Sequence, residues 1–287
     1  MSPERRDRSV HGHGASLQVD ESRIVEEAWN AVASRYKAYW SPRLRPYLER
    51  AVAAFHPAPP GPIAVPGCGP GEEVLLLLEN FPDRSVIALD ISIEMVALLK
   101  KDLRERGIGS VVATVGAAEN LSAFVRQAAG VLSCFTLDLL PNPLAALTDW
   151  SRCLRAGGSI VILFWPRPRT GTPTARIQAA IQAKTGQGKL LWEARALEAL
   201  PLFGLRLVRD ERVQFEVPCE TPQEYFQAMM DAGPLQMVAR KFGADLLKEC
   251  MKSWLVNHGL RRKGSTWTDL PEARLWLIER TDEELSH

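Results

Sequence analysis

The sequence has no long hydrophobic run, no C-x-x-C pair of cysteines and almost no excess of either charge. Its longest apolar stretches, such as 74–78 and 160–165, are far shorter than the about 20 residues needed to cross a bilayer, so we expect no membrane partner. The five cysteines occur singly, which argues against a disulfide framework or a zinc site. We therefore predict a cytoplasmic protein that binds no metal.

Balanced charge limits the partners of the chain further. Its 35 Lys and Arg residues offset 34 Asp and Glu residues, which leaves a formal net charge of +1. No broad basic face can then hold a phosphate backbone, so we expect no nucleic-acid partner. With 287 residues, of which 46% are hydrophobic, the chain can bury one α/β core and carry an additional cap. The polar segment 1–19 lacks the apolar stretch of a secretion signal and is predicted to be a disordered leader.

The next segment has the pattern of a helical lid. Apolar residues recur at helical spacing, which predicts helices over 20–40 and 42–55. The PAPPGP sequence at 57–62 breaks regular structure and predicts a hinge. We therefore separate an N-terminal helical lid, 20–56, from a main domain, 60–287.

From residue 63 onward, short apolar runs alternate with amphipathic helices. This alternation is typical of βαβ units and predicts an α/β fold with a doubly wound parallel sheet. The predicted strands are 63–66, 85–89, 110–115, 130–135 and 159–165, and the helices between them are 72–80, 92–106 and 143–155.

The pattern changes after residue 165. Helical periodicity at about 172–200 leads to an alternating run at 205–217, and a last strand-like run follows at 272–279. Between the last two strands lies a helical stretch, about 221–258, which we assign to a cap over the ligand crevice. The cap carries apolar side chains that suit a small, partly apolar substrate: Phe226, Met229, Met230, Met237 and Phe242.

A glycine-rich loop follows the first predicted strand. Gly67, Cys68, Gly69 and Gly71 occupy the turn into the next helix, where glycines permit a sharp turn and a close approach of a ligand. Asp90 ends the next strand, where a carboxylate can accept both hydroxyls of an adenosine ribose. The loop and this acid together predict a nucleoside site.

The charge beside this loop favours one kind of nucleoside. Glu72 and Glu73 fill the first turn of the helix, and two carboxylates would repel the pyrophosphate of a dinucleotide. A cationic sulfonium ligand tolerates them. The alternative is that both glutamates only compensate the helix dipole.

Four segments in this order resemble the motif series of small-molecule class I methyltransferases. They are IAVPGCGPG, VIALDIS, VGAAENL and LSCFTLDLLPNPLAALTDWSRCLRAGGSIVI, which together cover about residues 60–165; WNAVASRYKAYW at 29–40 and the tail from 208 to 279 are also similar to that family. The resemblance implies a Rossmann-like, seven-stranded sheet with N-terminal helices and an inserted helical cap, and S-adenosylmethionine as cofactor. The residues implied to bind it are Gly67, Cys68, Gly69, Gly71, Asp90, Ile91, Ala117, Ala118, Glu119 and Cys134.

Two positions depart from the family pattern. Val65 stands where the family has an acid two residues before the first glycine, and Ala117 stands where it has an acid at the adenine amine. Each change removes a possible hydrogen bond to the ligand, worth about 1 kcal/mol or more. Glu119 or a water could replace one of these two contacts.

Methyl transfer needs alignment more than a dedicated catalytic motif. Our candidate base is Asp138, although its carboxylate could instead cap the turn that follows. Tyr36 and Tyr39 could close over a sulfonium through their ring faces, or belong to the core. Phe164 and Trp165 could line the acceptor pocket or pack in the core.

Three function classes stay open at this point. The first is methyl transfer to a small molecule by a monomer or homodimer. The second is another reaction on the same fold and ligand, such as ligand cyclisation or a pericyclic step, which Val65 and Ala117 suggest. The third is a non-catalytic binding module, which the absence of a charged recognition surface makes the weakest of the three.

Overall fold

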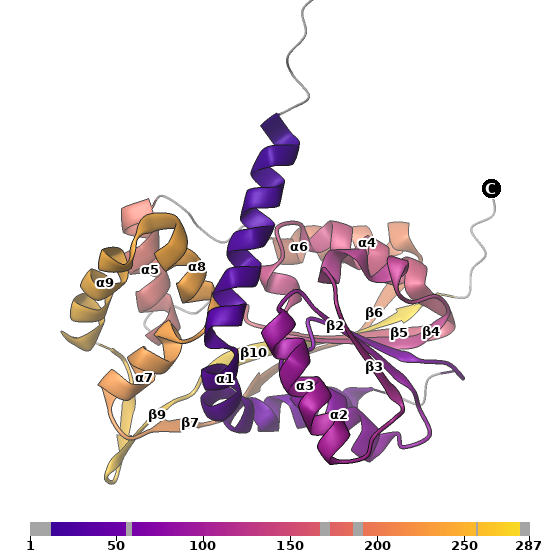
Figure 1. Cartoon of the computed structure of the whole chain (residues 1–287), viewed down its shortest axis with the longest axis horizontal. Helices are drawn as coiled ribbons and strands as arrows, with labels where there is room; N and C mark the ends of the chain where they lie inside the picture. Colours follow the sequence, from indigo (N-terminus) through magenta and orange to yellow (C-terminus); the bar gives the residue numbers. More distant parts are fainter. Residues whose placement is uncertain (1–12, 56–58, 167–172, 186–191, 257, 282–287) are drawn as a thin grey trace, which may run out of the picture.

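A twisted seven-stranded sheet forms the centre of the protein, with strand order β3-β2-β1-β4-β5-β10-β6 (Figure 1). The computed structural model describes residues 13–55, 59–166, 173–185, 192–256 and 258–281. The strands are β1 Ile63–Pro66, β2 Val86–Asp90, β3 Val111–Val115, β4 Ala128–Cys134, β5 Leu154–Phe164, β6 Leu205–Gln214 and β10 Glu272–Arg280. The first five pair in parallel, and β10 runs antiparallel between β5 and β6. The predicted α/β fold with a doubly wound sheet is confirmed.

Each face of the sheet has its own apolar layer. In β5, the side chains of Val161 and Leu163 join one hydrophobic cluster, and those of Ile160, Ile162 and Phe164 join the other. Alternate residues of a strand point to opposite faces, so this strand presents apolar side chains on both faces of the sheet. Helices cover both faces and bury these side chains. Helices α2 Glu72–Asn80 and α3 Ile93–Glu105 cover the first face, and α4 Pro143–Cys153 and α6 Trp192–Ala199 cover the second.

The N-terminal segment is one helix, α1 His13–Ala54, rather than a leader followed by two helices. Residues 13–19 of the predicted leader are therefore helical, and residues 1–12 lie outside the described residues. Pro42 and Pro46 lie inside the helix and do not end it. Figure 1 shows that the helix bends sharply, which fits two prolines that remove backbone donors.

The second half of α1 belongs to the main core, and a lid function of 20–56 stays a prediction. Leu44, Tyr47, Ala51 and Phe55 are buried in the same cluster as the sheet residues. The Tyr47 hydroxyl donates to the Pro271 carbonyl at 2.5 Å, beside β10.

The cap consists of α7 Pro222–Met230, α8 Gly233–Phe242 and α9 Ala244–Val256, with α5 Pro173–Thr185 beside α9 (Figure 1). The predicted strand at 205–217 ends at Gln214, and a second sheet of order β7-β9-β8 follows. Its strands are β7 Val217–Cys219, β8 Arg261–Lys263 and β9 Thr266–Asp269. The sequence did not predict this sheet because strands of three or four residues are too short for a periodic signal.

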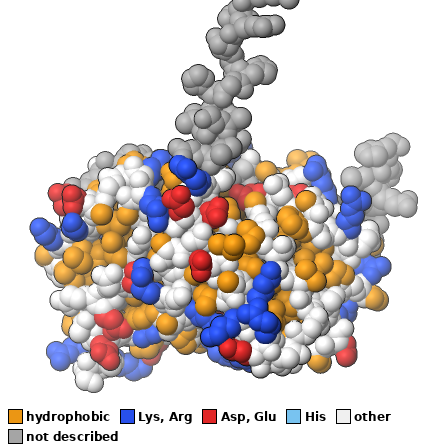
Figure 2. All heavy atoms as spheres, in the orientation of Figure 1, with side chains coloured by type: hydrophobic (Ala, Val, Ile, Leu, Met, Phe, Trp, Pro, Cys, Tyr) orange, Lys and Arg blue, Asp and Glu red, His pale blue; other side chains and the backbone are white. Residues whose placement is uncertain are grey.

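The surface shown in Figure 2 mixes basic and acidic side chains among hydrophobic ones, without one large basic patch on that face. Among the helices that the structure describes, none combines the length and the apolar character required to cross a membrane.

Candidate functional site

The glycine loop has a backbone that only glycine adopts easily. Gly67, Gly69 and Gly71 have φ angles of 72°, 49° and 94°, in the left-handed region. A Cβ atom on Gly71 would lie 2.3 Å from the side chain of Leu99 in α3, whereas one on Gly69 would meet nothing within 4 Å. Gly71 therefore permits α2 and α3 to pack closely, and Gly69 borders open space.

Asp90 ends β2 beside this loop and holds it in place. Its Oδ2 accepts a hydrogen bond from the Gly69 amide at 2.8 Å, and its Oδ1 accepts one from the Ser92 amide at 2.9 Å. The carboxyl is only 8% exposed, and burial raises its pKa to about 6 against the effect of these two amides. A carboxylate oxygen has two lone pairs, so Asp90 can also accept hydrogen bonds from two ligand hydroxyls.

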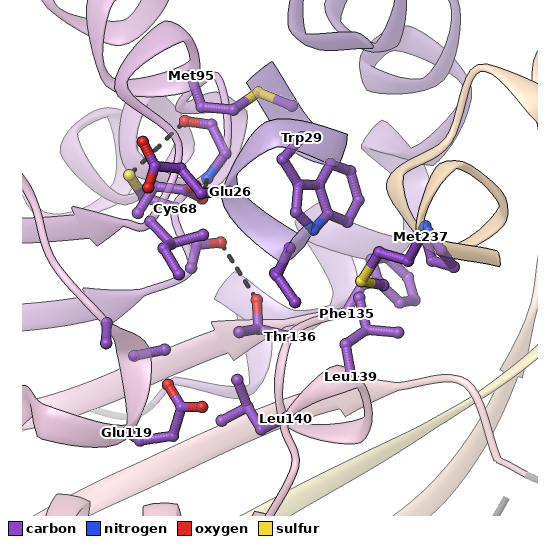
Figure 3. Close-up of a pocket in the computed structure, with 18 of the residues that line it drawn as sticks. Glu26, Trp29, Cys68, Met95, Glu119, Phe135, Thr136, Leu139, Leu140 and Met237 are labelled. Atoms are coloured by element: carbon purple, nitrogen blue, oxygen red, sulfur yellow. Dashed lines mark hydrogen bonds between the residues drawn. The ribbon is translucent and has the colours of Figure 1, made fainter. Parts of the chain in front are cut away.

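The loop and Asp90 border a cavity of about 1100 Å³ at the carboxyl ends of β1, β2 and β4 (Figure 3). Open α/β sheets bind ligands at this edge, where the strand order reverses. The predicted residues that line the cavity are Tyr36, Gly67, Cys68, Gly69, Asp90, Ile91, Ala117, Ala118, Glu119 and Cys134. Gly71 does not line it and acts instead through the packing of α2.

An apolar chamber completes the cavity on the side of α1 and α8. Figure 3 shows Trp29, Met237 and Phe135 on the side of the cavity away from Cys68. The Trp29 ring also meets the Tyr36 ring edge-on, with 5.5 Å between the centroids. The chamber thus joins the N-terminal helix to the cap, two segments far apart in the sequence.

Phe135 reaches the cavity through an unusual backbone turn. Its φ of 56° lies in the left-handed region, which is rare for a large side chain and costs on the order of 1 to 3 kcal/mol. Its ring stacks on Trp165 with 4.3 Å between the centroids and an angle of 16°. Trp165 thus lies behind Phe135, and Phe164 is buried in the cluster on the opposite face of the sheet. For Phe164 the alternative of core packing is confirmed.

Asp138, the predicted base, does not line the cavity. It lies in the short helix η2 Leu137–Leu139 and is only 8% exposed, while its neighbours Thr136, Leu139 and Leu140 border the cavity. Asp138 is thus separate from the lining residues, and its role as a base stays a prediction.

Glu73 lines the cavity, although the sequence did not identify it as a binding residue. It lies in the first turn of α2, lines the cavity and is only 6% exposed. Burial raises its pKa to about 8 against a hydrogen bond from its own backbone amide, and the charges of Asp90 and Glu72 add to the rise. Glu72 differs, because its carboxylate pairs with the Arg45 guanidinium at 2.6 Å. Two adjacent acids at the start of a helix look alike in the sequence, so the sequence could not predict which of them is buried.

The charged side chains around the cavity are mostly acidic. Its lining contains Glu21, Glu26, Glu72, Glu73, Asp90 and Glu119 against Arg23 and Lys241. Both cations already have carboxylate partners, since Lys241 lies 3.1 Å from Glu21 and Arg23 lies 3.8 Å from Glu27. Such a cavity suits a cationic or neutral ligand better than an anionic one.

Comparison with known proteins finds a similarity in the same part of the chain. Residues 63–158 match a family model described as a methyltransferase domain. The trans-aconitate 2-methyltransferase of Acidovorax ebreus (strain TPSY) is 41% identical over 68 residues, which are 24% of this chain and 26% of that protein. The match thus spans about a quarter of this relative's length and gives no information on its remaining parts.

Two solved structures share the fold over most of the chain. The [4+2]-cyclase SpnF has a TM-score of 0.56 at 15% identity, with 92% of this chain and 95% of that chain covered. Geranyl diphosphate C-methyltransferase from Streptomyces coelicolor A3(2), in complex with Mg²⁺, geranyl-S-thiolodiphosphate and S-adenosyl-L-homocysteine, has a TM-score of 0.52 at 16% identity, covering 82% of this chain and 76% of that chain. At these identities the likeness establishes the fold alone.

Proposed function

We propose that this chain, a member of the class I S-adenosylmethionine-dependent methyltransferase family, transfers a methyl group from S-adenosylmethionine to a small, largely apolar acceptor. The observation that carries the proposal is one cavity that joins a nucleoside cradle to an apolar chamber. Methyl transfer requires both ligands side by side, and about 1100 Å³ is enough for them.

The residues of the cradle fit S-adenosylmethionine. Gly69 leaves space for a ligand against the loop, and the Asp90 carboxylate suits the two ribose hydroxyls. Ala117, Ala118 and Glu119, after β3, would border the adenine. The excess of acids in the lining suits a ligand that carries a sulfonium and an ammonium group.

The cofactor supplies an activated methyl group, and the chain supplies orientation. Tyr36 lies in the cavity with its ring edge against Trp29, and burial raises the pKa of its hydroxyl, which therefore stays protonated at neutral pH. Tyr36 then serves as a hydrogen-bond donor and an aromatic neighbour of the sulfonium rather than as a base. Since Asp138 lies off the cavity, we assign the catalysis to alignment of the two ligands and to exclusion of water.

The chamber indicates an acceptor with few negative charges. Trp29, Phe135 and Met237 offer apolar contact area, and the two cations of the lining already have carboxylate partners. The relative from Acidovorax ebreus is named for trans-aconitate, an acceptor rich in carboxylates. Binding such an acceptor would need cationic side chains that are not already paired. We therefore propose a neutral or cationic acceptor, and a cytoplasmic location for the reaction.

Calorimetry and product analysis test this function. S-adenosylhomocysteine should bind the purified protein, and incubation of S-adenosylmethionine with a panel of apolar amines and phenols should give S-adenosylhomocysteine and a product one methylene heavier. Absence of S-adenosylhomocysteine binding would overturn the proposal. Enzymatic methylthioadenosine without an acceptor would instead support ligand cyclisation, the alternative that no feature of this cavity favours.

A further inference from the structure

Glu73 is a buried carboxyl group inside the cavity with no cation beside it. Among the described residues, no Lys, Arg or His forms an ion pair with it, whereas the adjacent Glu72 pairs with Arg45. The ionisable groups that interact with Glu73 are all acids, phenols or thiols: Glu72, Asp90, Tyr36, Cys68 and Cys134. Its own backbone amide donates a hydrogen bond to the carboxyl group. A buried carboxylate also favours a positive partner, which the described residues do not provide and a ligand can supply.

The position of Glu73 identifies which end of the ligand reaches it. Its electrostatic neighbours Cys68 and Cys134 lie at the ends of β1 and β4, whereas Ala117 and Glu119 lie beyond β3. Asp90 ends β2, which lies between β3 and β1 in the sheet. A ligand with its ribose on Asp90 and its adenine near Glu119 therefore extends its amino-acid end toward Glu73. That end carries an ammonium group, which donates hydrogen bonds, whereas a sulfonium has no proton to donate.

Val65 strengthens this assignment. The family pattern has an acid at this position of the first strand, and here the side chain is an aliphatic group with no exposed surface, packed in the core. The strand end therefore offers no carboxylate, and Glu73 offers one from the first turn of the next helix.

We propose that Glu73 is the anionic partner of the ammonium group of bound S-adenosylmethionine and replaces the carboxylate that is missing at Val65. This inference rests on the proposed cofactor and adds a binding residue to it. When the ammonium group enters, the carboxyl gives up its proton and forms a charge-assisted hydrogen bond in a water-poor site. Specificity for the intact cofactor over nucleosides that lack the amino-acid end follows from this contact.

The test compares two ligands that differ in the amino-acid end. S-adenosylhomocysteine has the ammonium group, and methylthioadenosine has the same nucleoside and a thioether without it. Calorimetry at pH 7.5 should show that Glu73→Gln weakens S-adenosylhomocysteine binding at least tenfold and changes methylthioadenosine binding less than twofold. Glu73→Asp should restore part of the loss, and Glu105→Gln, which removes an exposed acid outside the cavity, should stay within about twofold of the wild type.

The pH dependence gives a second readout that a structural role would not change. S-adenosylhomocysteine affinity of the wild type should rise between pH 6.5 and 8.5 and stay nearly flat in Glu73→Gln. Equal weakening of both ligands, or unchanged S-adenosylhomocysteine affinity in a folded Glu73→Gln protein, would overturn the assignment. Failure of the wild type to bind either ligand would overturn the proposed function as well, and so the two failures are distinguishable.

Discussion

Replacement of Glu73 by Gln should remove a pH dependence from the stability of the ligand-free protein. The carboxyl is 6% exposed, and its pKa is about 8 in the folded chain against an ordinary value of 4.5. Between these values the folded state keeps its proton while the unfolded state ionises. The unfolding free energy therefore falls as the pH rises from 4.5 to about 8, and this contribution is constant at higher pH.

The magnitude follows from this displacement. Between pH 4.5 and about 8, each pH unit lowers the unfolding free energy of the wild type by about 1.4 kcal/mol. About two units of this range lie between pH 6 and pH 9. Over that interval the wild type should therefore lose about 2 to 3 kcal/mol relative to Glu73→Gln. The contribution of Asp90, whose pKa is about 6, is present in both proteins and cancels in the difference.

Urea unfolding at pH 6, 7, 8 and 9 measures this difference directly. The difference between the two unfolding free energies should widen from pH 6 to pH 8 and stay nearly constant from pH 8 to pH 9. Glu105→Gln, whose exposed carboxylate lies 3.6 Å from Lys101 in α3 and outside the cavity, serves as the control and should follow the wild-type slope. Parallel curves for the wild type and Glu73→Gln would refute the reasoning, because they would show that the folded state does not retain the proton.

Three further predictions follow from the cavity. Asp90→Asn should weaken S-adenosylhomocysteine binding more than tenfold in calorimetry, because a charge-assisted contact is lost; unchanged affinity would remove Asp90 from the cradle. Gly233→Ala should destabilise the protein by about 1 to 3 kcal/mol in urea unfolding, since the new Cβ would lie 2.2 Å from the Trp29 ring, whereas Gly109→Ala, which meets nothing within 4 Å, should be tolerated; equal stabilities would contradict the close packing of α1 on α8. Tyr36→Phe should keep S-adenosylhomocysteine affinity within about twofold and lower the methyl-transfer rate about tenfold in single-turnover assays, and an unchanged rate would assign the hydroxyl no role.

The sequence was sufficient for the parts of the fold that depend on local order. The βαβ pattern predicted β1 and α2 at their observed ends, and the glycine loop with Asp90 predicted the nucleoside cradle. These features are readable because the period of apolar residues reports the element type, and because left-handed φ angles at a turn require glycine.

Only the tertiary structure decided which side chains meet in the cavity. Trp29 and Met237 are more than 200 positions apart and lie in the lining together because α1 packs on α8. Adjacent residues differ as well: Glu73 is buried in the cavity wall while Glu72 pairs with Arg45, and Leu139 lines the cavity while Asp138 does not. Side-chain direction depends on how a short turn or helix start is rotated against its neighbours, and packing between distant segments sets that rotation.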